Sequence, residues 1–315
     1  MLTKLAARNP YWYAAIVPAI LSWISTAFSV LVLKDYGMSV FILIPLFIGA
    51  CSTVFYGKQK PSSIGSYISL AVVSLLIYCA GLILFALEGL ICIVMAAPLG
   101  IAIAAIGCCI GQIILNYRKN SSIGIIIGFA VCIPAAMSFE SVSKDDEDVF
   151  SVTTSVVIDQ KPEAVWNKVV AFSKMDPPEE WLFRVGIAYP TDAVIKHTGS
   201  RTIRYCNFST GCFVEPITTW QEPNLLAFTV EETPRPLQEL SPYNIDPAHL
   251  HGYFVSKKGQ FQLTALPNGK TLLTGTTWYA HKIKPAFYWR FWSNYIIHKI
   301  HNRVLAHIKK EAEAM

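Results

Sequence analysis

Charged residues are scarce in this chain of 315 residues. Lysine, arginine, aspartate and glutamate make up 15% of it, against about 25% in soluble domains, whereas hydrophobic residues make up 53%. The scarcity is confined to one half, because residues 1–143 hold seven basic and three acidic residues and residues 144–315 hold nineteen and eighteen. The net charge of +5 therefore comes mostly from the apolar half, and it does not indicate a nucleic-acid partner.

Sequence motifs of several enzyme and metal-binding classes are missing. The chain has no GxSxG elbow, no P-loop, no glycine-rich dinucleotide motif and no HExxH pair. It has eight cysteines but no CxxC pair, and six of them lie in apolar segments, where a thiol behaves as a small hydrophobic group. The histidines of the second half show no metal-ligand spacing. We therefore expect no cofactor and no metal, and no motif identifies a catalytic residue.

Long apolar stretches dominate the first half. A helix needs roughly 20 apolar residues to cross a bilayer core of about 30 Å. Five stretches approach this length, and the second and fifth are the shortest, so that four is the alternative count; they are about 12–33, 39–56, 65–87, 90–115 and 122–139. Two small-residue repeats, Gly107-x-x-x-Gly111 and Gly124-x-x-x-Gly128, favour close helix packing. The sequence predicts a transmembrane helical bundle over residues 1–142.

The charges between these stretches indicate an orientation. Basic residues are retained on the cytoplasmic side of a membrane. Here they precede the first stretch and separate the second from the third and the fourth from the fifth, as Lys4, Arg8, Lys58, Lys60, Arg118 and Lys119. With five spans, this pattern predicts an integral protein of the plasma or inner membrane, with a cytoplasmic N-terminus and an extracytoplasmic C-terminal domain. A cytoplasmic C-terminal domain is the alternative, because only a few charges indicate the orientation.

An acidic run separates the two halves. The stretch "SKDDEDVF" begins at Ser143, and residues 143–149 read as a solvated hinge. Calcium binding by these acids is the alternative, although the glycine and the terminal glutamate of an EF-hand loop are absent. We therefore expect a linker at 143–149 between the membrane domain and a globular domain at 150–315.

The second half alternates between short strand patterns and turn signals. A first strand at 150–159 and two short helical segments, 161–172 and 176–187, precede the remaining strands. These are predicted at 193–197, 201–208, 212–220, 225–231, 259–266 and 271–281, and a long amphipathic helix is predicted at 284–313. An antiparallel sheet packed on one long helix is an α+β arrangement.

This order resembles that of the START-like superfamily, also called SRPBCC, which includes polyketide cyclase/dehydrase and lipid-transport proteins. The resemblance rests on "VWNKVVAFSKM" after the first strand and "FSTGCFVEPITTWQEPNLLAFTV" in the middle of the domain. It covers about residues 150–315 and excludes the membrane half. It implies a helix-grip fold that holds a hydrophobic ligand between the curved sheet and the last helix. Some members of the family are cyclases or aromatases, so an enzyme acting on a hydrophobic substrate is the alternative.

The hairpin at Ser209 decides which side chains meet inside such a domain. A two-residue turn places Arg204 opposite Glu215 and Cys206 opposite Phe213. A three-residue turn places Cys206 opposite Cys212 instead, where an oxidising compartment would allow a disulfide. A cross-strand ion pair on the surface is a further alternative for Arg204 and Glu215.

Seven residues are the candidates for contact with a lipid or other small hydrophobic ligand. They are predicted from strand alternation, side-chain type and the resemblance: Arg204, Phe213, Glu215, Ile217, Trp220, Trp278 and Trp292. The long proline-rich segment 233–254 is a candidate lid, because long loops of this kind are often functional.

Overall fold

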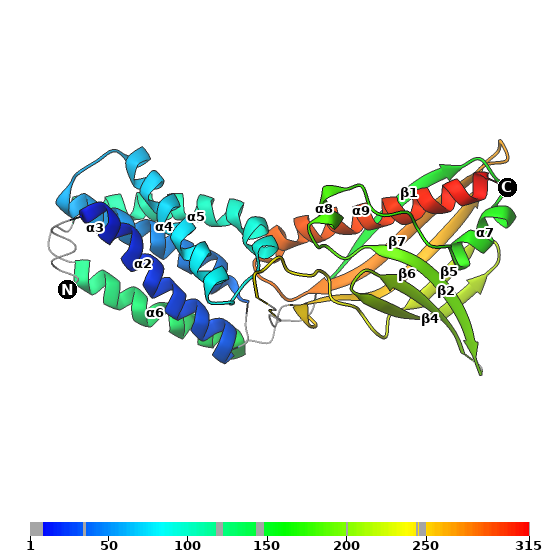
Figure 1. The fold of residues 1–315 in the computed structure, drawn as a ribbon, viewed down its shortest axis with the longest axis horizontal. Helices are drawn as coiled ribbons and strands as arrows, with labels where there is room; N and C mark the ends of the chain where they lie inside the picture. Colours follow the sequence, from blue (N-terminus) through cyan, green and yellow to red (C-terminus); the bar gives the residue numbers. More distant parts are fainter. Residues whose placement is uncertain are drawn as a thin grey trace. The chain divides into compact units, whose positions relative to one another are not determined.

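The computed structural model describes residues 9–33, 36–117, 122–142, 148–199, 201–243, 245 and 250–314. The chain forms two compact units, whose elements are drawn in Figure 1. Unit 1 comprises Met1–Asp145, Glu239–His249 and Ile283–Tyr288, and unit 2 comprises Asp146–Gln238, Leu250–Lys282 and Trp289–Met315. The chain first changes unit within the predicted linker, most of which lies outside the described residues. The chain then returns to unit 1 twice, at Glu239–His249 and at Ile283–Tyr288. The predicted domains, with boundaries at 142 and 150, do not contain these two returns.

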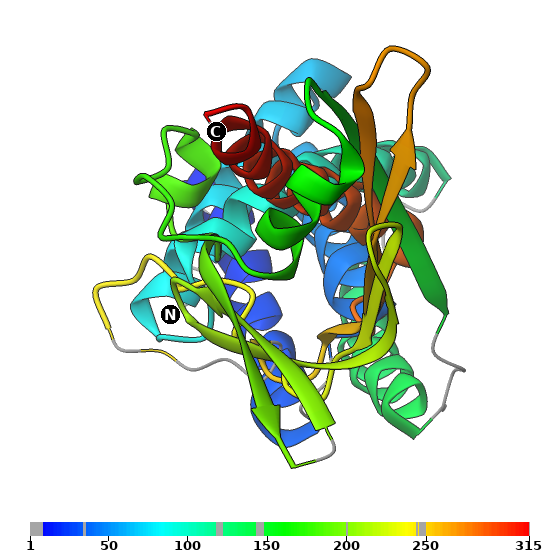
Figure 2. The ribbon, with the colours of Figure 1, turned by 90° about the vertical axis from the view of Figure 1, so that its right-hand side faces the viewer.

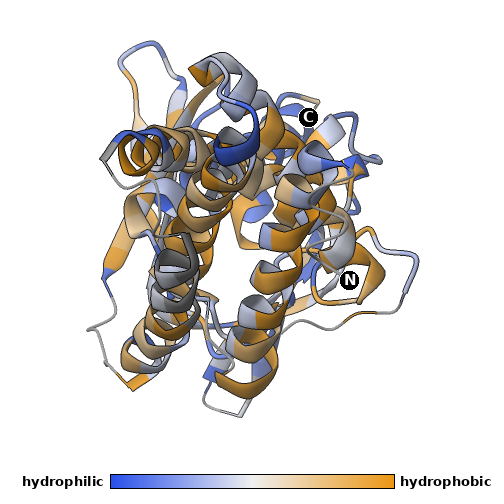
Figure 3. Ribbon diagram, turned by 90° about the vertical axis from the view of Figure 1, so that its left-hand side faces the viewer, coloured by the Kyte–Doolittle hydropathy of each residue, from blue (hydrophilic) through white to orange (hydrophobic). Residues whose placement is uncertain are grey.

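Unit 1 is helical. Its elements are α2 (Pro10–Ala27), which continues as η1 (Phe28–Leu33), η2 (Ser39–Leu43), which continues as α3 (Ile44–Gln59), α4 (Ile64–Leu84), α5 (Leu90–Tyr117) and α6 (Ser122–Val142). Figure 3 shows how apolar these helices are along their length. Four stretches within the described residues are long and apolar enough to cross a membrane: Pro10–Leu33, Ser39–Gln59, Ile64–Leu84 and Leu90–Asn116.

The predicted count of about five spans is therefore corrected to four. The second predicted stretch, although short, extends to Gln59 and qualifies. The fifth does form a helix, α6, but the apolar stretch recognised there, Val131–Val142, is too short for a span.

Glycines bring α3 and α5 into backbone contact. A Cβ atom on Gly107 would lie 2.3 Å from the carbonyl oxygen of Leu46, and one on Gly49 would lie 2.0 Å from that of Ala104. Side chains larger than hydrogen cannot occupy these positions without moving a helix. In membranes such small-residue faces replace the hydrophobic effect as the basis of helix packing. Of the two predicted repeats, the one that begins at Gly107 is packed, whereas Gly124 and Gly128 meet no atom within 4 Å.

Unit 2 is built on one sheet of seven antiparallel strands. Their order across the sheet is β1-β7-β6-β5-β4-β3-β2, so that β1, the first strand in the chain, pairs with the last. The strands are β1 (Val149–Ile158), β2 (Pro190–Thr198), β3 (Arg201–Phe208), β4 (Gly211–Gln221), β5 (Leu225–Thr229), β6 (Phe254–Ala265) and β7 (Thr271–His281). The helices are α7 (Pro162–Val170), the single turn α8 (Trp181–Arg184) and α9 (Ala286–Glu313). The expected antiparallel sheet with a long C-terminal helix is confirmed.

The core of unit 2 lies between the sheet and α9. Figure 2 shows the sheet curving around one side of this helix. Val304, Leu305 and Ile308 of α9 belong to a buried cluster with inward-facing residues of the strands, including Leu226 and Leu273. Each such side chain contributes roughly 1.5–3 kcal/mol on burial. The apolar face of the predicted amphipathic helix therefore packs on the sheet.

Candidate functional site

The hairpin of β3 and β4 turns through Ser209 and Thr210. Phe208 pairs with Gly211, whose φ of +151° is reached readily only by glycine. The two-residue turn sets Arg204 opposite Glu215 and Cys206 opposite Phe213. Of the two predicted registers, the structure contains the one that pairs Arg204 with Glu215.

Arg204 and Glu215 form a buried ion pair on the inner face of the sheet. The Arg204 Nη1 donates a hydrogen bond to Glu215 Oε2, and the Arg204 Nε donates to the carbonyl oxygen of Val170 at 3.3 Å. The exposed fractions are 2% for Arg204 and 6% for Glu215. The alternative of a surface cross-strand pair is therefore excluded by the structure.

Three aromatic rings surround the guanidinium group. Its central carbon lies 5.5 Å from the ring centroids of Phe172 and Phe228 and 5.4 Å from that of Phe261. A cation over an aromatic face gains about 0.5–2 kcal/mol, and the gain is larger where water is excluded. The three rings come from the segment after α7, from β5 and from β6, so no sequence pattern announces them.

Burial and ion pairing have opposite effects on the pKa values of Arg204 and Glu215. Burial alone would lower the pKa of Arg204, but the charge and hydrogen bond of Glu215 together with those of Cys206 outweigh burial and hold that pKa above its ordinary value. Burial raises the pKa of Glu215, and the guanidinium of Arg204 opposes this increase. The pair therefore depends on its own two charges, since removal of either one leaves the other buried and uncompensated.

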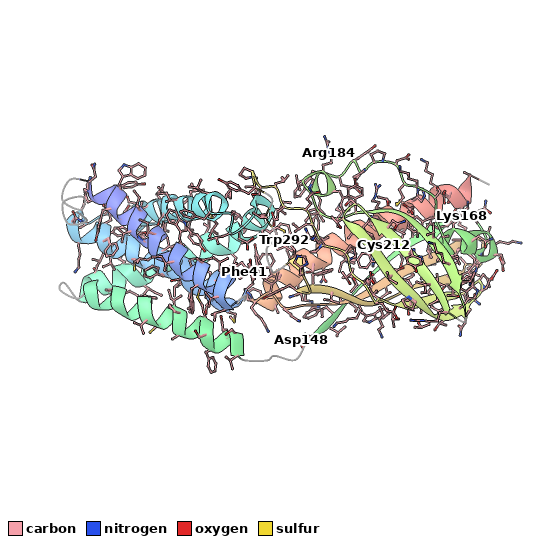
Figure 4. All side chains as sticks on the ribbon, turned by 60° about the horizontal axis from the view of Figure 1, so that its bottom comes forward. Phe41, Asp148, Lys168, Arg184, Cys212 and Trp292 are labelled. Atoms are coloured by element: carbon pink, nitrogen blue, oxygen red, sulfur yellow. The ribbon has the colours of Figure 1, made fainter. Side chains whose placement is uncertain are left out.

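Cys206 and Cys212 are free thiols, and the disulfide alternative is not formed. Cys206 lies opposite Phe213, whereas Cys212 lies opposite Asn207, so the two sulfurs belong to different pairs of the ladder. Burial raises the pKa of the Cys206 thiol, which therefore stays protonated at neutral pH. Figure 4 labels Cys212 on β4.

The other five predicted ligand residues are placed differently from one another. Phe213 and Ile217 are partly buried against the same core cluster as Cys206. Trp220 is 43% exposed, and its ring meets that of the buried Trp166 edge-on at 5.7 Å. Phe213 and Ile217 thus pack on the core of unit 2, whereas Trp220 meets that core through Trp166.

Trp278 and Trp292 are not among the described contacts of the Arg204–Glu215 pair. Strand alternation puts Trp278 on the face of β7 opposite to Leu273 and Tyr279, where Lys258 lies 4.7 Å from its ring centroid. Trp292, labelled in Figure 4, is in the first half of α9 beside Phe291 and Tyr295. Their prediction as ligand residues followed residue type rather than strand face.

Two histidines connect α9 to the sheet. His298 Nδ1 lies 2.8 Å and His301 Nδ1 3.1 Å from the hydroxyl of Thr154 on β1, and His301 Nε2 lies 2.8 Å from the hydroxyl of Thr277 on β7. Burial lowers the pKa of His301 to about 4, and His298 adds to the effect. A neutral His301 therefore fixes the helix on the strands at physiological pH.

The segment predicted as a lid belongs to both units. Glu239–His249 groups with the helical unit, and the backbone N–H of Leu90 donates to the carbonyl oxygen of Leu240 at 3.0 Å. Residues 244 and 246–249 lie outside the described part of the chain. In its described part, this segment caps a helix of unit 1.

Comparison with solved structures gives low similarity over about half of the chain. A truncated norcoclaurine synthase from Thalictrum flavum aligns with a TM-score of 0.34 and 10% identity, over 54% of this chain and 96% of that chain. The di-domain ARO/CYC BexL aligns with a TM-score of 0.34 and 13% identity, over 61% and 59%. The protein XoxI from Bacillus cereus aligns with a TM-score of 0.33 and 13% identity, over 51% and 94%. No protein-family model and no curated protein matches the chain.

Proposed function

We propose that this protein is a membrane-anchored binding protein, whose unit 2 takes up a lipid or another small hydrophobic molecule near the membrane surface. The observation that carries the proposal is the Arg204–Glu215 pair, buried among aromatic rings on the sheet face that packs on α9. A buried ion pair contributes little to stability compared with apolar residues of similar volume. A few fixed polar groups in an apolar interior are, however, what orients a ligand.

The anchor is unit 1, with its four apolar helices. Tyr36 and Glu88 lie in the two connections at one end of the bundle, and Lys58 and Lys60 lie at the opposite end. The segments that return from unit 2 contact the first end, since the Lys284 N–H donates to the Tyr36 carbonyl oxygen at 3.3 Å. Because basic residues stay in the cytoplasm, we assign the end with Tyr36 and Glu88, and with it unit 2, to the extracytoplasmic side.

The side of unit 2 also depends on where α6 ends. The N–H of Ser39 donates to Glu140 Oε2 at 3.0 Å, so the last turn of α6 lies beside the start of η2. The chain therefore arrives at this end of the bundle before it enters β1. This connection supports the assignment independently of how many helices meet a length criterion.

Photo-crosslinking tests the binding function. Membranes that contain the full chain would be loaded with a fatty acid or phospholipid carrying a diazirine group, irradiated and digested for peptide mass spectrometry. We expect adducts on peptides of β3, β4 and α9 in addition to those on the helices of unit 1. The double variant Arg204→Met/Glu215→Leu should lose the adducts of unit 2 and keep those of unit 1. Adducts confined to unit 1 would rule the proposal out.

An enzyme acting on a hydrophobic substrate is the second candidate. The observation in its favour is the raised pKa of Glu215, because acid–base groups often have a pKa shifted by burial. It predicts that Glu215→Gln leaves crosslinking in place but abolishes conversion of the bound molecule. Identical masses for the bound molecule in both proteins would exclude this candidate.

A further inference from the structure

Three metal-ligating side chains meet at one end of unit 1, outside the site described above. Glu88 lies in the connection between α4 and α5, Cys92 in the first turn of α5, and Glu239 in the segment that returns from unit 2. One ligand atom from each, two carboxylate oxygens and one sulfur, lie within 4.8 Å of one another. Glu88 is only 7% exposed.

The backbone holds Glu239 in this position. Its Oε2 accepts a hydrogen bond from the N–H of Ile91 at 3.3 Å, although 148 residues separate the two. A Cβ atom on Gly89 would lie 1.9 Å from the same oxygen, so the approach requires glycine there. The side chain of Glu239 thus reaches the start of α5 by passing directly over Gly89, where a Cβ atom would collide with it.

The cluster concentrates negative charge where water is excluded. Burial raises the pKa of Glu88 to about 8, and the charge of Glu239 acts in the same direction, while the Tyr36 hydroxyl and the Gly89 N–H oppose it. Burial also raises the pKa of Glu239. Burial thus disfavours the negative charge of both carboxylates.

We propose that Glu88, Cys92 and Glu239 bind one divalent transition-metal ion of the Zn²⁺ class. Zn²⁺ accepts carboxylate oxygen at about 2.0–2.2 Å and thiolate sulfur at about 2.3 Å, whereas Ca²⁺ and Mg²⁺ select oxygen alone. The sulfur of Cys92 therefore sets the metal class. Tetrahedral coordination needs ligand atoms about 3.5 Å apart, so the side chains close in by about 1 Å on binding.

Three protein ligands leave a fourth coordination position for water or another group. The metal also joins the connection before α5 to the segment that contains Glu239, which is distant in sequence. Its loss should therefore increase hydrogen exchange in peptides that cover 85–92 and 237–243. A merely acidic surface patch would show no such coupling.

Metal titration of the full chain tests the proposal. Untagged protein in detergent would be stripped with a chelator, titrated with Zn²⁺ in the presence of excess Mg²⁺, and analysed for bound metal after gel filtration. We expect one Zn²⁺ per chain, with affinity that rises with pH because the thiol must lose its proton. Cys92→Ser and Glu239→Gln should each weaken binding by more than about tenfold. Cys109→Ser, at an exposed position on the same helix, is the matched control and should bind normally.

A spectroscopic measurement on the unaltered protein covers the case in which a variant misfolds. Co²⁺ in place of Zn²⁺ should produce a thiolate-to-cobalt charge-transfer band in the near-ultraviolet. The band should disappear in Cys92→Ser and remain in Cys109→Ser. Absence of the band in the unaltered protein, or unchanged Zn²⁺ affinity in a folded Cys92→Ser variant, would overturn the proposal.

Discussion

Among individual residues, Arg204 is a charged side chain buried in an interior made mostly of apolar and aromatic side chains. Its only charged neighbour among the contacts described is Glu215, and both are almost fully buried. Arg204→Met should therefore destabilise unit 2 by about 3–5 kcal/mol, because it leaves the Glu215 carboxylate buried without a partner. Hydrogen exchange of β3 and β4 peptides in the full chain measures the change.

The matched control removes both charges. Arg204→Met/Glu215→Leu keeps the volume of the pair and should restore stability to within about 1 kcal/mol of the unaltered protein, or exceed it. Equal destabilisation by the single and double variants would show that packing of Arg204 against the three rings, rather than its charge, supports the fold.

The opposing register of Arg204 and Glu215 could be predicted because a two-residue turn leaves few alternatives. The rings of Phe172, Phe228 and Phe261 could not, since they come together only when the sheet curves. Trp278 illustrates the opposite case. Its size suggested a ligand contact, although its place in the alternation of β7 puts it on the other face.

His301 gives unit 2 an acid-sensitive contact. Its pKa is lowered by burial to about 4 from 6.5, so the unfolded chain takes up a proton first as the pH falls. The stabilisation is complete above pH 6.5 and is lost progressively towards pH 4, by up to about 3 kcal/mol. His301→Gln should flatten the dependence of the free energy of unfolding on pH in this interval. The same pH dependence in His301→Gln and in the unaltered protein would contradict this role of His301.

Among the elements, α3 and α5 approach most closely through glycine. Gly107→Ala should lower the thermal stability of the bundle, because the added Cβ meets the Leu46 carbonyl oxygen and overpacking of this kind costs about 1–3 kcal/mol. Gly128→Ala on α6 is the control, since its Cβ meets nothing within 4 Å. The melting temperature of the full chain in detergent distinguishes the two. Equal melting temperatures would mean that α3 and α5 separate at little cost.

Element type followed directly from residue periodicity, whereas element bounds and span counts did not. The predicted strand at 259–266 begins earlier, at Phe254, because a register shift between Ser256 and Lys258 interrupts the alternation. The apolar stretches gave helices throughout, but composition alone does not tell how much of each helix suits a bilayer. Hence α6 was counted as a span although its recognised apolar part is only Val131–Val142.

For the whole molecule, the order of domains was readable from the change in charge density near residue 143, but the return of the chain was not. Glu239–His249 and Ile283–Tyr288 belong to the helical unit although they interrupt the sequence of the sheet unit. Some of their contacts are backbone hydrogen bonds, such as that between Leu90 and Leu240, which carry no residue-type signal. The proposed metal-ligand cluster could not be predicted, because Glu239 lies far from Glu88 in sequence.

The same contacts make membrane topology a decisive measurement. Single cysteines introduced at the exposed positions Gln59 and Ala265 would be treated in intact cells with a membrane-impermeant maleimide, with the unaltered protein as background. Basic residues at the Lys58 end favour the cytoplasm, and the segments of unit 1 that lead into unit 2 lie at the opposite end. Ala265→Cys should therefore react in intact cells, and Gln59→Cys only after permeabilisation. The reverse pattern would place unit 2 in the cytoplasm and restrict its ligands to those of the inner leaflet.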